Sequence, residues 1–254
     1  MCLIILATKS HKKFPFIFAA NRDEFYERPT AKADFRTEHP QMLAGKDLKD
    51  GGTWLGITRE GKFAAITNFR DLSIIKDNAP SRGNIVKNFL VNEVTTKDYS
   101  SHLISEGKNY NGFNFIYGDV NSLNYYSNVT NSVEEIPDGV HGLSNHLLNT
   151  PWAKVEMGKE KIKIILNQTS FDETDLLKLL NDTRQATDNS LPDTGIGLEL
   201  ERLLSPMFIK SEKYGTRCST VILIDTFGNV SFTESTFNHL TQKFELVKFN
   251  FKLE

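Results

Sequence analysis

Two continuous apolar runs lie near the start of the 254-residue chain, at Cys2–Ala7 and Phe14–Ala20, with polar Lys9–Lys13 between them. An antiparallel strand with one face in water alternates apolar and polar residues, and neither run alternates. The runs therefore predict a hairpin that is buried on both faces, so that further layers must cover it above and below. A chain of this length is long enough to bury such a core.

The remaining pattern predicts more hairpins, interrupted by blocks of helix. The expected strand pairs are Thr53–Ile57 with Phe63–Thr67, Phe113–Tyr117 with Asn124–Ser127, and Val221–Asp225 with Val230–Thr233. Helices are expected after caps at Ser81, Thr150 and Asp172, and a short one at Leu198–Leu204. Strands with helices in blocks predict an α+β fold in which two antiparallel sheets lie between helices, as one domain of residues 1–254.

Composition excludes several classes of protein. Thirty Lys and Arg against 32 Asp and Glu give a net charge of −2, which predicts no bulk attraction to nucleic acid or to an anionic membrane. The chain has only Cys2 and Cys218, so no disulfide framework is indicated. No apolar run reaches transmembrane length, and the apolar start lacks the basic leader of a signal peptide. We expect a soluble cytoplasmic protein with no integral membrane segment.

Cys2 is the main candidate for chemistry. Removal of Met1 would make it the first residue, with a thiol and a free α-amine on the same residue. A thiol is intrinsically nucleophilic, and an α-amine has an unperturbed pKa of about 7.7–8.0. One residue would then supply both the nucleophile and its general base.

The segment Asn21-Arg22-Asp23-Glu24 directly follows the second apolar run. A solvated turn with local ion pairs is one interpretation of these four polar residues. The other is functional, because antiparallel pairing puts the end of the second strand beside the start of the first. Asp23 would then hold and orient the α-amine of Cys2.

Other candidates lie further along the chain. Asn68 closes a predicted strand and Asn145 lies in a loop; each is an ordinary turn residue by itself, but together they could donate hydrogen bonds to an oxyanion. Arg217 precedes an apolar strand, and beside Cys2 it would favour the thiolate. Trp54, after paired glycines, fits either the core or the rim of a pocket, and we expect the rim.

Taken together, these motifs resemble the NRDE family, also called the transport and Golgi organisation 2 family. The resemblance spans nearly the whole chain in seven ordered blocks: Met1-Cys2, Asn21-Arg22-Asp23-Glu24, Gly51-Gly-Thr-Trp-Leu-Gly56, Thr67-Asn-Phe-Arg70, Gly142-Leu-Ser-Asn145, Thr150-Pro-Trp152 and Tyr214-Gly-Thr-Arg217. That family resembles, more distantly, the N-terminal-nucleophile cysteine hydrolases of the penicillin V acylase and bile salt hydrolase type.

The resemblance implies a four-layer αββα sandwich and a role for each candidate. It implies Cys2 as nucleophile with its own α-amine as base, and Asp23 as the group that orients this amine. Asn68 and Asn145 would serve the oxyanion and the substrate, and Arg217 would tune the thiolate. Further substrate contacts are expected from a small set of residues: Trp54, Asn21 and His146.

One position departs from the hydrolase pattern. Those enzymes place an arginine three residues before the aspartate, where this chain has Ala20. Arg22 is expected to substitute for it from a neighbouring position, although adjacent residues of a strand point to opposite faces.

Two functions are expected to compete. The first is an amidohydrolase that cleaves a non-peptide carbon–nitrogen bond through an acyl-Cys2 thioester. The alternative is a non-catalytic binding or trafficking protein on the same fold, which holds a lipid-like or haem-like ligand. No Cys-x-x-Cys-His occurs and the six histidines form no motif, so no metal or cofactor is assigned, although His141 and His146 flank Asn145. Both interpretations imply a small-molecule partner, and a purely structural scaffold leaves the polar candidates without a purpose.

Overall fold

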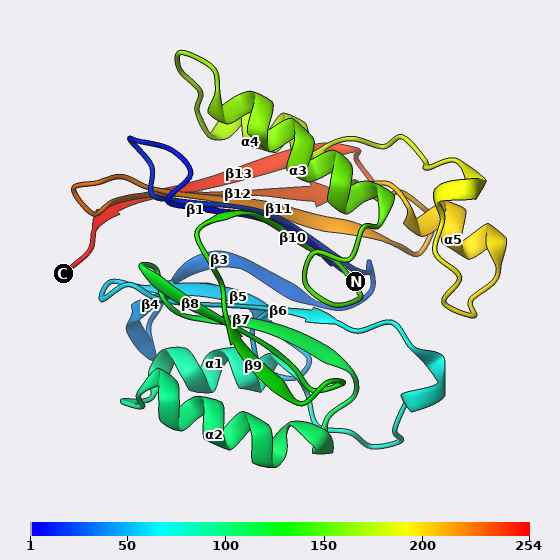
Figure 1. The fold of residues 1–254 in the computed structure, drawn as a ribbon, viewed down its shortest axis with the longest axis horizontal. Coiled ribbons are helices and arrows are strands. Elements are labelled where there is room, and N and C mark those ends of the chain that lie inside the picture. Colours follow the sequence, from blue (N-terminus) through cyan, green and yellow to red (C-terminus); the bar gives the residue numbers. More distant parts are fainter. Residues whose placement is uncertain (1) are drawn as a thin grey trace. The chain divides into compact units, whose positions relative to one another are not determined.

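The computed structural model describes residues 2–254 as two compact units, each with one antiparallel sheet and its own helices (Figure 1). The first unit comprises the residues up to Glu27, Asp138–Ser144 and Leu148–Phe251, and the second comprises Arg28–Pro137, Asn145–Leu147 and Lys252–Glu254. The predicted loss of Met1 lies outside the described residues. The predicted α+β class with two antiparallel sheets is confirmed, and the single domain stays a prediction.

The sheet of the first unit has six strands in the order β10-β1-β2-β11-β12-β13. The apolar hairpin predicted from the sequence is the pair of β1 and β2, and it lies inside this sheet. The strand bounds are β1 Cys2–Thr8, β2 Phe16–Phe25, β10 Gly139–Leu143, β11 Tyr214–Ile224, β12 Asn229–Asn238 and β13 Lys243–Lys252.

Helices α3 (Ala153–Leu166) and α4 (Glu173–Leu180) lie over one face of this sheet (Figure 1). Odd-numbered residues of the hairpin, such as Ile5 and Ala19, pack in a core with residues of both helices. Even-numbered residues such as Phe18 are also buried. The prediction that the hairpin is buried on both faces is therefore confirmed. The short helix α5 spans Leu198–Leu204, as predicted, and a 3-10 turn spans Asp188–Ser190.

The second unit has a seven-stranded sheet in the order β3-β4-β5-β6-β7-β8-β9, with α1 and α2 on one face (Figure 1). Aromatic side chains of β7, including Phe115 and Tyr117, pack with Phe89 and Tyr99 of the helices. The bounds are β3 Thr30–Arg36, β4 His39–Asp47, β5 Leu55–Thr58, β6 Lys62–Asn68, α1 Gly83–Val91, α2 Thr96–Glu106, β7 Phe113–Asp119, β8 Ser122–Ser127 and β9 Ser132–Glu135, with 3-10 turns at Leu72–Ile74 and Gly107–Asn109.

Of the three predicted helix caps, one is correct. Asp172 caps α4 as expected, and its carboxylate accepts from the backbone N–H of Thr174 at 2.8 Å. The cap predicted at Thr150 is wrong, because its carbonyl accepts from the N–H of Trp152 in a tight turn. Trp152 is therefore the cap of α3. The Ser81 cap is one residue early, since Arg82 caps α1.

The prediction that Asn21–Glu24 follows a strand is also wrong. Strand β2 continues to Phe25, so these polar residues lie within it, and Asn21, Arg22 and Asp23 are buried. They remain extended because β11 pairs with all four of them, and β1 pairs with Asn21 and Arg22 on the other side. Within residues 2–254, no helix has the length and apolar character needed to cross a membrane.

Candidate functional site

Cys2 begins β1 and lies directly opposite Arg22 of β2. Arg22 in turn lies opposite Cys218 of β11. Because directly paired residues of antiparallel strands project from the same face, Arg22 lies between the two cysteines on one face of the sheet. Arg22 is 6% exposed and Cys218 is 5% exposed, whereas Cys2 is partly exposed. The guanidinium thus belongs to a row in which Cys218 is buried and Cys2 is the partly exposed residue.

The thiol of Cys2 is held in its protonated form. Burial raises its pKa, and the negative charge of Asp23 acts in the same direction. The backbone N–H of Asp23 donates a hydrogen bond to the sulfur, and this bond and the charge of Arg22 both lower the pKa. The hydroxyl of Ser144 donates to the Cys2 carbonyl at 3.1 Å and fixes the backbone there. A thiol in this environment needs a base in order to act as a nucleophile.

The carboxylate of Asp23 projects from the opposite face, which α3 and α4 cover, and is 2% exposed. Thr216 donates its hydroxyl to Asp23 Oδ1 at 2.7 Å, and the N–H of Ile209 donates to Thr216 Oγ1 at 2.9 Å. Burial raises the pKa of Asp23, while the ammonium group of Lys154, the Thr216 hydrogen bond and the charge of Arg22 lower it. The carboxylate is therefore fixed in direction at the end of β1 where Cys2 lies.

The side chain of Asn21, the first residue of the segment Asn21–Glu24, forms hydrogen bonds within the first unit. Its side-chain N–H groups donate to the carbonyls of Leu180 and Met207 at 2.9 and 2.8 Å. Ser219 donates its hydroxyl to Asn21 Oδ1 at 2.6 Å. The side chain thus ties β2 to the end of α4 and to the segment after α5. We assign Asn21 a structural role, and its predicted substrate contact gains no support from this geometry.

Arg217 lies at a β-bulge, where the pairing of β2 and β11 shifts between Thr216 and Cys218. Its Nη1 donates to the carbonyl of Phe25 at 2.8 Å. Burial lowers the pKa of Arg217, and the like charge of Arg22 lowers it further. The guanidinium opposite Cys2 in the strand register is thus that of Arg22. A role for Arg217 in tuning the thiolate stays a prediction.

In the second unit the two predicted asparagines lie together. Asn68 is the last residue of β6 and Asn145 donates its side-chain N–H to the Asn68 carbonyl at 2.9 Å. The N–H of Arg70 donates to the Asn145 carbonyl at 2.7 Å. Asn145 is fully buried, whereas Asn68 is partly exposed. The structure thus brings together two predicted residues from distant segments, and their convergence on Cys2 and their roles toward an oxyanion stay predictions.

A further asparagine, which the sequence analysis missed, supports this pair. Asn114 of β7 donates to Thr67 Oγ1 at 3.2 Å and to the His146 carbonyl at 2.9 Å, and it accepts from the Tyr125 hydroxyl at 2.7 Å. Its signal is a polar residue inside the apolar run Phe113-Asn-Phe115. The His146 ring lies 4.9 Å from that of Phe69, and burial lowers the pKa of His146, so it is neutral at pH 7.

Trp54 packs against the core of the second unit, and its expected place at the rim of a pocket stays a prediction. It is partly buried and packs against the cluster that includes Phe89. Its ring lies over Gly45, where an added Cβ would lie 2.2 Å from the ring. A contact of Trp54 with substrate stays a prediction. His141, the other histidine near Asn145 in sequence, pairs its Nδ1 with Asn149 at 3.1 Å.

Three more polar residues of the first unit went unrecognised in the sequence. Lys154 of α3 is 3% exposed, and its ammonium donates to the Leu204 carbonyl at 2.8 Å. Glu234 of β12 is 2% exposed and hydrogen-bonds the Cys218 thiol. Burial raises the pKa of Cys218 well above its usual value, so this second thiol is neutral. Thr216, which positions Asp23, is the third.

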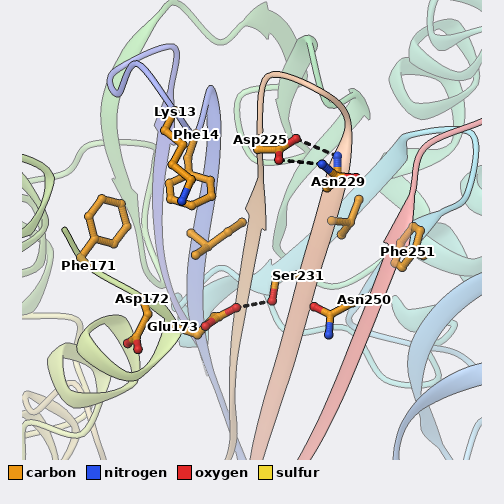
Figure 2. A pocket seen from close by; sticks show the side chains of 12 residues that line it. Lys13, Phe14, Phe171, Asp172, Glu173, Asp225, Asn229, Ser231, Asn250 and Phe251 are labelled. Atoms are coloured by element: carbon orange, nitrogen blue, oxygen red, sulfur yellow. Dashed lines mark hydrogen bonds between the residues drawn. The ribbon is translucent and has the colours of Figure 1, made fainter.

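A cavity of about 560 Å³ opens on the first unit at the far end of the same strands, near Phe14 and Leu223 (Figure 2). Its carboxylates already have partners: Asp225 accepts from Asn229, and Glu173 accepts from Ser231 and pairs with Lys248 at 3.2 Å. Cys2 lies at the other end of β1, so this cavity is separate from the candidate site. Among residues 2–254, no three His, Cys, Asp or Glu side chains are grouped to hold a metal ion.

Comparison with solved structures identifies the fold. The structure of the C2A mutant of conjugated bile acid hydrolase from Clostridium perfringens matches 99% of this chain and 97% of that chain, with a TM-score of 0.51. At 10% identity this likeness shows the fold alone. The chain thus has the α+β fold of the N-terminal-nucleophile hydrolases, as the sequence motifs predicted.

Sequence comparison then identifies the family. The model of the family described as Transport and Golgi organisation 2 matches residues 1–239. The Transport and Golgi organization 2 homolog of Mus musculus is 35% identical over 277 residues, covering 100% of both chains. The homolog of Homo sapiens is 36% identical and covers 92% of each chain. The chain belongs to the Transport and Golgi organisation 2 family.

Proposed function

We propose that this protein is an N-terminal cysteine hydrolase that cleaves a non-peptide amide through an acyl-Cys2 thioester. The observation that carries the proposal is the environment of Cys2. Its sulfur accepts a hydrogen bond from the Asp23 backbone, and its cross-strand neighbour is the buried guanidinium of Arg22. The fold of the N-terminal-nucleophile hydrolases supports it.

The first half of the reaction forms the thioester. After removal of Met1, the α-amine of Cys2 takes the thiol proton while the sulfur attacks the amide carbonyl carbon. The tetrahedral intermediate then collapses, the carbon–nitrogen bond breaks, and the α-ammonium gives its proton to the leaving amine. An acyl group on Cys2 and a free amine are the products of this half.

The second half regenerates the enzyme. The α-amine takes a proton from water as the water oxygen attacks the thioester carbon. The carbon–sulfur bond breaks, the sulfur recovers its proton from the α-ammonium, and a carboxylic acid leaves. One water is consumed per turnover and Cys2 returns to its starting state.

The side chains proposed to assist Cys2, those of Asp23 and Arg22, lie on opposite faces of β2. The Asp23 carboxylate, directed by Thr216, would orient the α-amine through an ion pair with its protonated form. Arg22 would stabilise negative charge as it develops on the sulfur, since it lies opposite Cys2. Because burial keeps the thiol neutral, proton removal would coincide with attack and no thiolate would be stored. Asn68 and Asn145 are the proposed donors to the oxyanion.

The test combines intact mass with labelling by an acylating thiol probe. We expect protein purified from its normal host to lack Met1 and to gain one acyl group, mapped to Cys2. Cys218 is the internal control, because it is a buried thiol in the same row. The Cys2→Ala variant should lose labelling and amide hydrolysis, and Cys218→Ala should keep both. Retention of Met1, or equal labelling of both cysteines, would contradict the proposal.

A second candidate function is binding of a lipid-like or haem-like molecule without catalysis. The observation that favours it is Ala20, which stands where the hydrolases have an arginine. Titration with an acyl-CoA and with haem tests this candidate. Saturable binding that is unchanged in Cys2→Ala, with no hydrolysis of any acyl amide by the mature protein, would favour binding over catalysis.

A further inference from the structure

The cavity of about 560 Å³ near Phe14 is lined only by residues of the first unit (Figure 2). It lies where the connection between β1 and β2 runs beside the connection between β11 and β12, since the N–H of Thr226 donates to the Lys13 carbonyl at 3.2 Å. Its volume is within the range of about 300–1,000 Å³ that is typical of small-molecule sites. The proposed hydrolysis makes no use of this cavity.

Aromatic rings form one wall of the cavity. The rings of Phe14 and Phe171 lie 5.6 Å apart, and both side chains pack against the core of the first unit, which fixes their position. The ammonium of Lys13 lies 4.8 Å from the centroid of the Phe14 ring (Figure 2). The face of an aromatic ring carries partial negative charge and attracts cations. This wall thus already holds one cation, which the chain itself supplies.

The charged residues that line the cavity are mostly acidic. Three carboxylates, those of Asp172, Glu173 and Asp225, line it together with the single ammonium of Lys13. Lys248, which pairs with Glu173 at 3.2 Å, adds a second ammonium nearby. The carboxylates still outnumber the ammonium groups, so the electrostatic potential of the cavity favours a cation over an anion.

Hydrogen bonds keep the carboxylates of Glu173 and Asp225 ionised. Burial acts to raise the pKa of Glu173, but hydrogen bonds from Ser231 and Lys248 bring it below its usual value. Burial also acts to raise the pKa of Asp225, and the side-chain and backbone N–H groups of Asn229, which donate at 2.8 and 2.9 Å, lower it overall. Both groups therefore carry a negative charge at pH 7.

The same hydrogen bonds decide which kind of cation fits. A carboxylate that already accepts from several donors attracts a cation by its charge, but it gains little from a further N–H donor. A quaternary ammonium group has no N–H to satisfy, and aromatic faces are the surfaces that recognise it. The rings of Phe14 and Phe171 beside Glu173 and Asp225 therefore suit a quaternary ammonium better than a primary amine.

We propose that this cavity binds an organic cation that carries a quaternary ammonium group and an apolar body. The ammonium group lies against the rings of Phe14 and Phe171, where it replaces the ammonium of Lys13, and the apolar body contacts Leu223 and Phe251. This inference goes beyond the proposed function, because Cys2 lies at the other end of β1 and takes no part in the binding.

The test measures binding of hexyltrimethylammonium to the full chain by isothermal titration calorimetry. Hexanol and hexanoate are the neutral and anionic counterparts, since they carry the same apolar chain with a different head group. We expect the cation to bind more tightly than the alcohol, and hexanoate to bind most weakly. Absence of binding by the cation, or equal affinity for the cation and the alcohol, would overturn the proposal.

Lys13→Met gives the sharpest variant, because its effect has an unusual sign. Loss of a like charge, and of the group that competes for the Phe14 ring, should tighten binding of the cation by roughly two- to fivefold. Lys12→Met is the matched control, since Lys12 is an exposed lysine next in sequence that does not line the cavity. Unchanged affinity in Lys13→Met, or the same change in both variants, would contradict the proposed site.

Two further variants test the carboxylates and the aromatic wall. Glu173→Gln keeps the shape of the side chain and should weaken binding by roughly two- to fivefold. Phe171→Leu should weaken it by roughly 2–30-fold, and a thermal melt shows whether this variant is folded. Cys2→Ala should bind the cation as the wild type does. Loss of hydrolysis in that variant with unchanged binding would separate this site from the proposed function, so that either proposal can fail without the other.

Discussion

Substitution of Asn21 by alanine tests whether this residue of the motif is structural. The amide donates to the carbonyls of Leu180 and Met207 and accepts from Ser219, and it is 1% exposed. Each buried group left without a partner costs about 1–3 kcal/mol. The Ser219 hydroxyl can rotate toward another acceptor, so the two carbonyls carry the loss. We expect Asn21→Ala to lower the free energy of unfolding by roughly 2–6 kcal/mol.

The measurement must report the first unit alone. The chain has two tryptophans, Trp54 in the second unit and Trp152 in the first. In a Trp54→Phe background, fluorescence during urea unfolding follows Trp152, and the midpoint and slope give the change in stability. Asn250→Ala is the control, because Asn250 is an exposed asparagine of the same sheet.

The result separates a structural role of Asn21 from a contact with substrate, which the sequence alone could not distinguish. A substrate-contacting asparagine would lose activity on substitution with little change in stability. If Asn21→Ala and Asn250→Ala both stay within about 0.5 kcal/mol of the wild type, as surface substitutions usually do, the structural role is refuted.

Three shorter predictions concern the titrating groups. Arg22→Gln should raise the pKa of the Cys2 thiol further and slow its alkylation by iodoacetamide at fixed pH by roughly tenfold, and an unchanged rate would contradict this. Cys218 should resist the same reagent in native protein and react fully in urea, because burial raises its pKa; mass mapping after each reaction checks this. Burial lowers the pKa of His146 from 6.5, so its neutral form stabilises the fold at pH 7 and this stability falls as the pH drops below about 6.5. His146→Gln should therefore lose less stability than the wild type between pH 7 and pH 5, as measured by thermal melting.

The local sequence pattern predicted much of the first unit, because the patterns that indicate its strands and helices involve residues close together in sequence. The unbroken run Cys2–Ala7 could satisfy its hydrophobic side chains only in a strand buried on both faces, and β1 is such a strand. The bounds Leu198–Leu204 were also correct, since Pro206 limits that helix. Strand β13 was missed although Val247, Phe249 and Phe251 alternate with polar residues, a period that is typical of a strand.

The candidate site was harder to predict, because its polar residues contradict the usual rules of burial. The sequence around Arg22 and Asp23 is typical of a solvated turn, yet both residues are buried within a strand. The sequence around Lys154 is typical of the exposed face of an amphipathic helix, yet the residue is 3% exposed and donates to the carbonyl of Leu204, which is distant in sequence. Charged residues are buried when they have partners, and partners distant in sequence leave no local signal.

The position of Arg22 in β2 bears on the departure at Ala20. Ala20 and Arg22 are two residues apart in β2, so their side chains project from the same face, and that face also carries Cys2. Two residues of a strand span about 7 Å, which the long side chain of an arginine can cover. An arginine at position 20 and Arg22 would therefore differ in position along the strand and not in the face they use. If Arg22 takes over that role, the slower alkylation expected of Arg22→Gln should be largely restored in Arg22→Lys, which keeps the charge on this face. A lysine variant as slow as the glutamine variant would show that the planar guanidinium, and not its charge alone, is required.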